Sequence, residues 1–346
     1  MFEVFKNVNY IQVEPVGNRE AVVIYEKKFT SNKKIMKAEL YITAHGGYYA
    51  EINGKQVSML LAPGFDCYLY RQPYQVYNVT EYLKKCGEEN KIEVSVSRGW
   101  YSWFAFRKDI EKNNETRGLK AMLFIIFEDG KTKSIETNET WQAFYGQFVS
   151  ADIYNGETFD RSREETLLSL IVSDKEQDEN LFLYDGEKIC EHEKIKPIAS
   201  FFTPKGEFVV DFGQEITGYV ELDLPMNTVK KGDIIEISYA EMLDKWGNFY
   251  TENYRSAKAK MIYICGVGKQ IYKPRHTFFG FRYIRFDKYP IGVDDKNVTA
   301  IAVYSDIKRT GNIQTSLPLL NKFIENVFWS QKGNFLDVPT DCPQRD

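Results

Sequence analysis

The C-terminal stretch of the chain reads Gln331-Lys-Gly-Asn-Phe-Leu-Asp-Val-Pro-Thr-Asp-Cys-Pro-Gln-Arg-Asp346. Pro339 and Pro343 cannot continue a helix, so they predict a loop on a surface or on the wall of a cleft. Three carboxylates and one guanidinium lie close together in this loop, on Asp337, Asp341, Arg345 and Asp346. These groups have two interpretations. Charged loops are usually just solvated, but the same groups could form one side of a pocket that binds a polyol.

An amphipathic helix is predicted just before this loop. Ser316 can cap its start, Pro318 suits its first turn, and Gly333 ends it. Apolar residues recur between these points at helical spacing: Leu319, Leu320, Phe323, Ile324, Val327, Phe328 and Trp329. An exposed apolar stripe tends to find a partner, so we expect the helix at 317–332 to fold back on the preceding domain or to pair between chains.

The ten residues Asp337-Val-Pro-Thr-Asp-Cys-Pro-Gln-Arg-Asp346 closely resemble the active-site signature of the bacterial α-L-rhamnosidases. These are inverting glycoside hydrolases with a toroidal (α/α)6 catalytic domain, and the resemblance implies that residues 307–346 begin that domain. It also implies that Asp341 accepts hydrogen bonds from the rhamnose hydroxyls and that Arg345 donates to them. The alternative is that both residues only shape the loop. In this family both catalytic carboxylates are glutamates that would follow Asp346, so we expect the chain itself to be inactive.

Composition and charge narrow the possible partners. The 346 residues carry a net charge of -4 and have an isoelectric point near 5.7, whereas nucleic acids and anionic membranes call for a basic surface. No apolar run is long enough to cross a membrane, and the first residues do not resemble a secretory leader. The sequence thus predicts a cytoplasmic protein whose partners are neutral ligands or proteins.

Cysteine and histidine are too scattered to predict a disulfide framework or a zinc site. The chain has five cysteines, Cys67, Cys86, Cys190, Cys265 and Cys342, without close spacing. Its three histidines, His45, His192 and His276, lie in different segments. We therefore expect no cofactor, apart from the calcium considered below.

The segment from about Ala38 to Glu165 has the pattern of β strands. Ile92-Glu-Val-Ser-Val96 alternates between apolar and polar residues, and Met122-Leu-Phe-Ile-Ile-Phe127 is apolar enough for a strand buried on both faces. Asn53-Gly54 can supply the two positive φ angles of a tight hairpin turn. Short strands separated by turns predict an antiparallel sandwich, so residues 1–165 are expected to form the first domain.

This first domain resembles the N-terminal domain of the same family, a jelly roll related to carbohydrate-binding modules. Among the matching pieces are Ile52-Asn-Gly-Lys-Gln-Val57 and Leu61-Ala-Pro-Gly-Phe-Asp66. Some members bind a sugar, with calcium, through this domain, which makes Asp66 a candidate contact for a sugar or calcium. The alternative is that Asp66 caps a turn.

Residues 166–190 include the acidic run Ser173-Asp-Lys-Glu-Gln-Asp-Glu-Asn180 and are expected to form a linker. A second sandwich is expected over 191–306, where several runs show aromatic or β-branched alternation. Its first two strands, Glu207–Phe212 and Gly218–Leu222, are expected to flank a bend at Gly213–Gly218. Phe208-Val-Val-Asp-Phe-Gly-Gln214 resembles the second sandwich of the rhamnosidases.

The predicted fold is therefore mainly β, with two antiparallel β-sandwich domains followed by the first helix of the toroid. The resemblance implies that the chain is the N-terminal part of an α-L-rhamnosidase acting on a rhamnose-containing oligosaccharide or glycoside. The alternative function is a non-catalytic carbohydrate-binding or scaffolding protein. Self-association through the helix at 317–332 is a further expectation.

Overall fold

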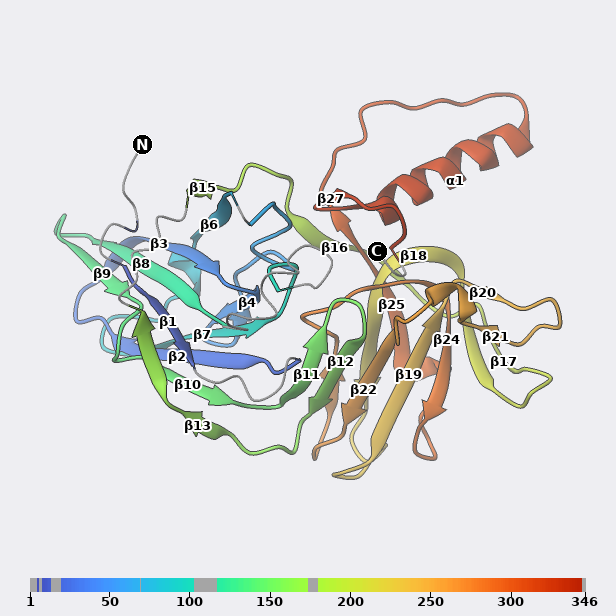
Figure 1. The fold of residues 1–346 in the computed structure, drawn as a ribbon, viewed down its shortest axis with the longest axis horizontal. Coiled ribbons are helices and arrows are strands. Elements are labelled where there is room, and N and C mark those ends of the chain that lie inside the picture. The colour runs from blue at the N-terminus through green and yellow to red at the C-terminus, as the bar shows by residue number, and fades with distance from the viewer. Residues whose placement is uncertain are drawn as a thin grey trace. The chain divides into compact units, whose positions relative to one another are not determined.

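The computed structural model describes residues 5, 8–13, 20–68, 70–102, 117–173 and 180–343. The chain is mainly β, as predicted, and divides into two compact units (Figure 1). Unit 1 comprises Met1–Ala151 and Glu164–Asp185, and unit 2 comprises Asp152–Arg163 and Gly186–Asp346. Within the described ranges, no helix is long and apolar enough to cross a membrane.

Unit 1 contains two sheets of mostly antiparallel strands. In order across the first sheet lie β14 (Leu170–Ser173), β1 (Tyr10–Val13), β8 (Leu119–Phe127), β3 (Ile35–Ala44), β6 (Gln72–Asn78) and β15 (Leu181–Leu183), with β9 (Thr132–Glu136) beside β8. In order across the second lie β13 (Thr166–Leu168), β10 (Gln142–Tyr145), β2 (Val23–Thr30), β7 (Glu89–Ser97), β4 (Gly47–Ile52) and β5 (Lys55–Gln56). A short helical turn, η1, covers Thr80–Tyr82.

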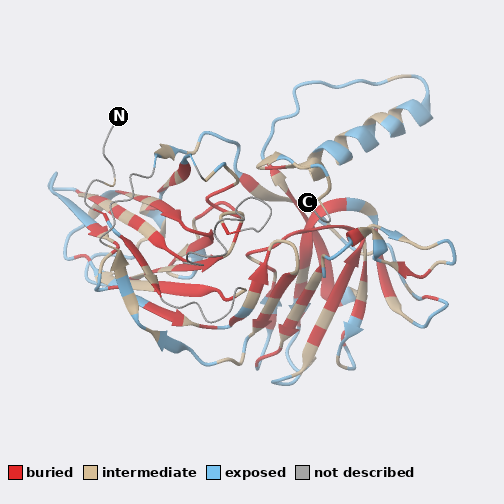
Figure 2. Ribbon diagram, in the orientation of Figure 1, coloured by how far each residue is buried: buried red, intermediate tan, exposed pale blue. Residues whose placement is uncertain are grey.

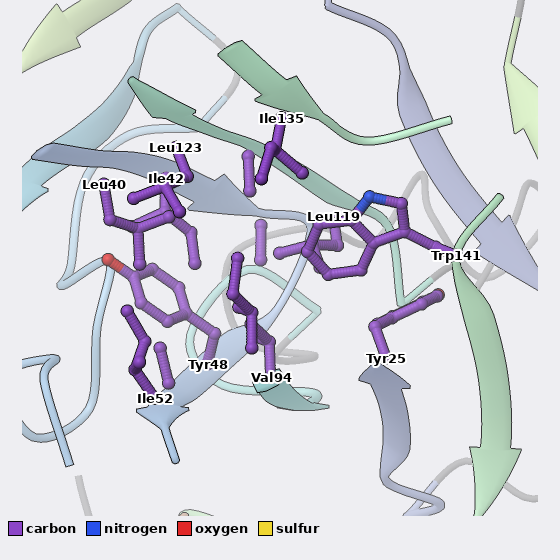
Figure 3. Packing of buried hydrophobic residues seen from close by; sticks show 14 of the residues in the cluster. Tyr25, Leu40, Ile42, Tyr48, Ile52, Val94, Leu119, Leu123, Ile135 and Trp141 are labelled. Atoms are coloured by element: carbon purple, nitrogen blue, oxygen red, sulfur yellow. The ribbon is translucent and has the colours of Figure 1, made fainter. Parts of the chain in front are cut away.

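Side chains from both sheets meet in one core, as a sandwich requires. Leu40 and Leu123 come from the first sheet and Tyr48 and Val94 from the second, and Figure 3 shows them packed together. The burial of the apolar residues of β7 is confirmed at Ile92, Val94 and Val96, but Ser95, which was expected to face outward, is buried as well. Strand β8 is buried on one face only, since Leu123 and Ile125 are buried while Phe124 and Ile126 are half-buried. The expectation of burial on both faces was therefore wrong.

The hairpin turn predicted at Asn53-Gly54 joins β4 to β5. Both residues have positive φ angles, 53° and 75°. Asn53 also fixes this corner through its side chain, whose Oδ1 accepts a hydrogen bond from the Lys91 amide at 3.0 Å. The turn is therefore held both by its backbone geometry and by a side chain that reaches the neighbouring strand.

The segment expected to be a linker instead supplies edge strands to unit 1. Strands β13 and β14 pair with β10 and β1, and β15 pairs parallel to β6. The apolar residues at 167–172 and 181–183 account for this, because they can cover the edges of both sheets. The acidic residues 174–179 lie outside the described part of the chain.

Most strands of unit 2 belong to one large sheet. Its order is β12 (Gly156–Asp160), β22 (Lys260–Ile264), β19 (Ile234–Ala240), β24 (Phe279–Lys288), β18 (Phe208–Leu224), β25 (Val298–Ser305) and β16 (Ile189–Ile195), while β17 (Ala199–Phe202) and β23 (Gln270–Tyr272) also pair with β18. Strand β11 (Phe148–Asp152) spans the point in the chain where unit 1 ends and unit 2 begins. In unit 2, β20 (Met242–Leu243) and β21 (Phe249–Tyr250) pair as a separate small sheet, and η3 (Glu252–Tyr254) and η4 (Asp295–Asn297) are short helical turns. Figure 2 shows the central strands of unit 2 as mostly buried.

Strand β12 was expected in the first domain but belongs to unit 2. It runs parallel to β22, and its Glu157 is buried. The Glu157 carboxylate accepts hydrogen bonds from the Tyr272 hydroxyl and from the backbone amides of Arg275 and His276. These contacts join residues more than a hundred positions apart, so the pattern of β12 alone could not predict them.

The bend expected at Gly213–Gly218 proves to be a bulge inside one strand. Strand β18 continues through it for 17 residues, and its register with β24 shifts between Asp211 and Ile216. Gly213 has a φ angle of 74°, which glycine adopts readily. A bulge bends its strand and changes the direction of the neighbouring side chains. The chain therefore forms one long, bent strand where two strands were expected.

The predicted helix is α1 (Pro318–Asn334), followed by the short hairpin β26 (Phe335–Leu336) and β27 (Val338–Pro339). Pro318 occupies the first turn, as predicted, but Leu317 rather than Ser316 holds the capping position. Thr315 explains the difference, because its Oγ1 accepts from the Leu317 amide at 3.2 Å and its carbonyl accepts from Asn321. The turn into the helix is thereby fixed one residue later than expected.

Candidate functional site

The C-terminal end of α1 is fixed to the sheet of unit 2. Thr217 is buried on β18, and its Oγ1 donates to the carbonyl of Gly333 at 2.6 Å. Lys332 donates from Nζ to Glu193 on β16 at 2.6 Å and lies over the rings of Tyr304 and Trp329. These contacts hold the last turn of α1, and the loop that follows it, against the sheet.

The loop predicted as an active-site signature is positioned by two further hydrogen bonds. The Asp337 amide donates to Ser305 Oγ on β25 at 2.8 Å, and the Thr340 amide donates to the carbonyl of Asn334 at 2.7 Å. Asp337 has a φ angle of 72°, a conformation that aspartate tolerates better than most residues. The chain thus reverses after α1, which brings Asp341 back beside the end of the helix.

A cavity of about 860 Å³ lies between α1 and strand β18, entirely within unit 2. We call it the α1–β18 pocket. Its walls come from the β18 bulge, the turn after β19, strand β24, one face of α1 and the loop after β27. The lining residues are Gly213, Gln214, Glu215, Ile216, Thr217, Glu241, Met242, Leu243, Arg282, Tyr283, Lys322, Asn326, Trp329, Ser330, Gly333, Asn334, Asp341, Cys342 and Pro343.

Of the two predicted rhamnose-binding residues, Asp341 lines this pocket. Its side chain is exposed, and Oδ2 accepts from the Sγ of Cys342 at 3.4 Å. Arg345 lies outside the described residues, as does Asp346. An exposed carboxylate in a cavity of this size can accept hydrogen bonds from the hydroxyl groups of a ligand.

The pocket also contains charged residues that sequence reasoning missed. Glu215 comes from the β18 bulge and Glu241 from the turn after β19, whereas Arg282 comes from β24. Arg282 makes a bidentate ion pair with Asp211, at 2.8 Å from Nε and 2.7 Å from Nη2. Hydrogen bonding to this carboxylate raises the pKa of Arg282. No signal in the sequence brings these positions together, because they lie between about 60 and 130 residues before Asp341 and converge only through β18 and β24.

The other faces of α1 have different surroundings. Phe328 and Glu325 border a second cavity of about 570 Å³, and the Arg309 guanidinium lies 3.5 Å from the centre of the Phe328 ring. Phe323 and Val327 are 62% and 50% exposed, as the predicted apolar stripe requires. Trp329 departs from that expectation, because it is half-buried and lines the α1–β18 pocket.

Asp66, the candidate contact in unit 1, is engaged with its own loop. Its Oδ1 accepts from the Cys67 amide at 2.6 Å, and its two oxygens accept from Arg71 at 3.1 Å each. Arg71 in turn lies over the ring of Phe182. This arrangement corresponds to the turn-capping interpretation of Asp66. Across the described ranges, no group of three or more histidine, cysteine, aspartate or glutamate side chains gathers to hold a metal ion.

Three domain models of one family match consecutive parts of the chain. They are the α-L-rhamnosidase N-terminal domain at residues 33–179, the bacterial α-L-rhamnosidase concanavalin-like domain at 202–304, and the bacterial α-L-rhamnosidase 6 hairpin glycosidase domain at 308–346. Together they include both units, α1 and the loop that carries Asp341.

Individual proteins are similar over nearly the whole chain. An α-L-rhamnosidase of Streptomyces avermitilis is 34% identical over 97% of this chain and 33% of its own length, and one of Formosa agariphila is 32% identical over 92% and 36%. The crystal structure of the native α-L-rhamnosidase from Aspergillus terreus has a TM-score of 0.89 at 32% identity, covering 99% of this chain and 41% of that one. The Streptomyces avermitilis enzyme complexed with L-rhamnose has a TM-score of 0.84 at 31% identity, covering 94% and 33%. The chain therefore spans about a third of the length of the curated relatives that it matches.

Proposed function

The chain belongs to the α-L-rhamnosidase family and corresponds to its N-terminal part. We therefore propose that it is part of an enzyme that hydrolyses terminal α-L-rhamnose from rhamnosides with inversion. Inversion requires one carboxylic acid to protonate the leaving oxygen and one carboxylate to activate water on the other face of the ring. It also requires groups that hold the ring hydroxyls, so that binding energy can favour the transition state. We propose that this chain supplies such holding groups and not the two catalytic carboxylates.

The observation that carries this proposal is the position of Asp341 in the α1–β18 pocket. An ionised carboxylate accepts hydrogen bonds from two neighbouring sugar hydroxyls and thereby orients the ring. Trp329 adds an aromatic surface to the same pocket. By its place in the signature, we propose that Arg345 donates to the hydroxyl groups that Asp341 does not bind.

Two measurements test the proposal. The 346-residue chain should show no turnover of an aryl α-L-rhamnoside above a buffer blank. Turnover above the blank would refute the proposal that this chain does not supply the two catalytic carboxylates. In ligand-observed NMR the chain should bind L-rhamnose, and Asp341→Asn should weaken that binding about tenfold or more, because a hydrogen bond to a charged group contributes about 1.5–3 kcal/mol.

The same binding experiment distinguishes the alternative function. If Asp66→Ala abolishes rhamnose binding while Asp341→Asn leaves it unchanged, the sugar binds to unit 1 and the chain acts as a non-catalytic carbohydrate-binding protein. A thermal melt of Asp66→Ala is the necessary control, because this substitution also removes the ion pair with Arg71.

We further propose that the exposed face of α1 pairs with the same face of a second copy when the chain is alone. Leu319 is 87% exposed, and Phe323 and Val327 continue the same face. Contiguous apolar surface of this kind favours association. Sedimentation velocity should show a dimer that Phe323→Glu converts to a monomer, whereas Glu325→Gln on another face of α1 should leave it intact. A wild-type chain that stays monomeric at high concentration would refute this.

A further inference from the structure

Trp329 is the aromatic side chain that α1 contributes to the α1–β18 pocket. The hydrogen bond between Thr217 and Gly333 holds the backbone of this last turn, but it does not fix the two side-chain torsions of the indole. Ordering a side chain when a ligand binds costs free energy, so an aromatic surface serves a ligand best when it is already held in place. The contacts of the ring itself are therefore decisive.

Lys332 makes a direct contact with this ring from one turn further along α1. Its Nζ lies over the Trp329 ring, 4.2 Å from the ring centre, because residues three apart share one side of a helix. The ammonium thus occupies one face of the indole, and a ligand can meet only the opposite face or an edge. Lys332 borders the second cavity and does not line the α1–β18 pocket, so it does not itself contact a ligand there.

The position of the Lys332 ammonium is fixed by the sheet of unit 2. Glu193 on β16 accepts from Nζ at 2.6 Å, and its two oxygens accept from the Tyr304 hydroxyl on β25 at 3.0 and 2.9 Å. The Tyr304 ring is in turn stacked on His192, with ring centres 3.7 Å apart. Burial alone would raise the pKa of Glu193, but the hydrogen bonds from Lys332 and Tyr304 lower it below its usual value. An ionised carboxylate held by two strands therefore anchors the ammonium.

The ion pair is too exposed to add much to the stability of unit 2. The side chains of Lys332 and Glu193 are 32% and 37% exposed, and pairs of this kind contribute little to folding because water screens them. A cation over an indole ring, in contrast, favours one arrangement of the two groups. The main consequence of the pair is therefore where the Trp329 ring lies.

Resting on the proposed rhamnose site, we propose that Lys332 is a positioning residue for sugar binding. Held by Glu193 and Tyr304, it keeps the indole of Trp329 in the orientation that a rhamnose ring in the α1–β18 pocket contacts. Because the indole is ordered before the ligand arrives, binding does not have to supply the free energy for ordering it. The sheet of unit 2 thereby influences the ligand through a side chain of α1.

The test uses the whole 346-residue chain labelled with 5-fluorotryptophan and observed by fluorine NMR. The chain has five tryptophans, and the signal that is missing from Trp329→Phe belongs to Trp329. This signal should shift when L-rhamnose is added. Lys332→Met should move the Trp329 signal, leave the other four in place and weaken L-rhamnose binding about fivefold. Lys332→Arg should bind L-rhamnose to within about twofold of wild type, because a guanidinium also pairs with carboxylates and stacks on aromatic rings.

Lys194→Met is the matched control. Lys194 lies on β16, as Glu193 does, and pairs with Glu221 at 3.4 Å, but it lines neither cavity. This variant should leave the Trp329 signal and the affinity for L-rhamnose unchanged. Should Lys332→Met fail to fold, Glu193→Gln replaces it. That substitution keeps the shape of the side chain and removes the charge that anchors the ammonium, so it should also move the Trp329 signal and weaken binding about threefold.

The outcomes separate the positioning role from the rhamnose site. If Lys332→Met lowers thermal stability but changes neither the Trp329 signal nor the affinity for L-rhamnose, Lys332 only anchors α1 and the proposal is wrong. If Asp341→Asn weakens L-rhamnose binding and Lys332→Met does not, the positioning role fails and the rhamnose site stands. A wild-type chain that does not bind L-rhamnose at all would overturn both.

Discussion

The imidazole of His276 should make the stability of unit 2 depend on pH. His276 lies between β23 and β24 and is 3% exposed. Burial, and then the nearby charge of Arg275, lowers its pKa to about 3. Its backbone amide donates to Glu157 Oε2 at 3.0 Å, in the cluster that also contains Tyr272. The imidazole is therefore neutral in the folded chain, whereas in the unfolded chain it titrates near pH 6.5.

The sign of the effect follows from proton binding. Above about pH 6.5 His276 is neutral in both states and contributes no pH dependence. Below that pH the unfolded chain binds a proton that the folded chain does not, so the free energy of unfolding falls until the pH reaches about 3. At about pH 5 the loss from this one group amounts to about 2 kcal/mol. Glu157 acts in the opposite direction, because burial raises its pKa even though its hydrogen bonds lower it.

Two measurements check the His276 prediction. The chain has three histidines, so the imidazole Cε1–H signal that disappears in His276→Gln identifies this residue by NMR. That signal should keep its position between about pH 8 and about pH 5. In urea denaturation, wild type should lose about 2 kcal/mol more than His276→Gln over that interval. A His276 signal with a midpoint near pH 6.5, or equal losses for the two proteins, would refute the reasoning.

Three further predictions concern the framework of the two units. Gly156→Ala should cost about 3 kcal/mol or more in thermal unfolding, because a Cβ at its φ of 110° would overlap the backbone of β22. Gly130→Ala, with a φ of 75° but open space around it, should cost only about 1 kcal/mol. Thr217→Val should speed hydrogen exchange in the last turn of α1 about fivefold, since one buried hydrogen bond of about 1 kcal/mol is lost, and unchanged exchange would contradict the anchoring. Asp66→Asn should lower the thermal stability of unit 1 by less than about 1 kcal/mol, because Arg71 is 54% exposed and the ion pair is screened, and a larger loss would show a deeper role.

Local patterns in the sequence predicted the parts of the fold that depend on local interactions. The buried positions of Ile92, Val94 and Val96 follow from the period of two along a strand, and the turn at Asn53-Gly54 follows from the positive φ angles that these residues accept. Helix α1 was predicted from apolar spacing and from Pro318. In each case the residues that determine the structure are neighbours in the chain.

The errors arose where distant residues decide the structure. β12 pairs in unit 2 because Glu157 meets Tyr272, more than a hundred residues later. The supposed linker forms strands because the edges of two sheets in unit 1 need partners, which the composition of 166–190 does not reveal. Within the candidate site, Asp341 was predicted by its motif, but Glu215 and Glu241 carry no motif and enter the pocket only through the packing of β18 and β24.

The contacts around Asp341 also bear on why a β unit precedes the helical segment. The loop that carries Asp341 is not held by α1 alone, because its hairpin is tied to β25 through Ser305 and the end of α1 is tied to β18 through Thr217. Both anchors lie on buried strands of unit 2, so the place of Asp341 in the pocket depends on that sheet. Strand β18 does more than anchor α1, because its bulge also forms one wall of the same cavity. The sheet of unit 2 is therefore part of the pocket, because it positions the loop and forms one wall of the cavity at the same time.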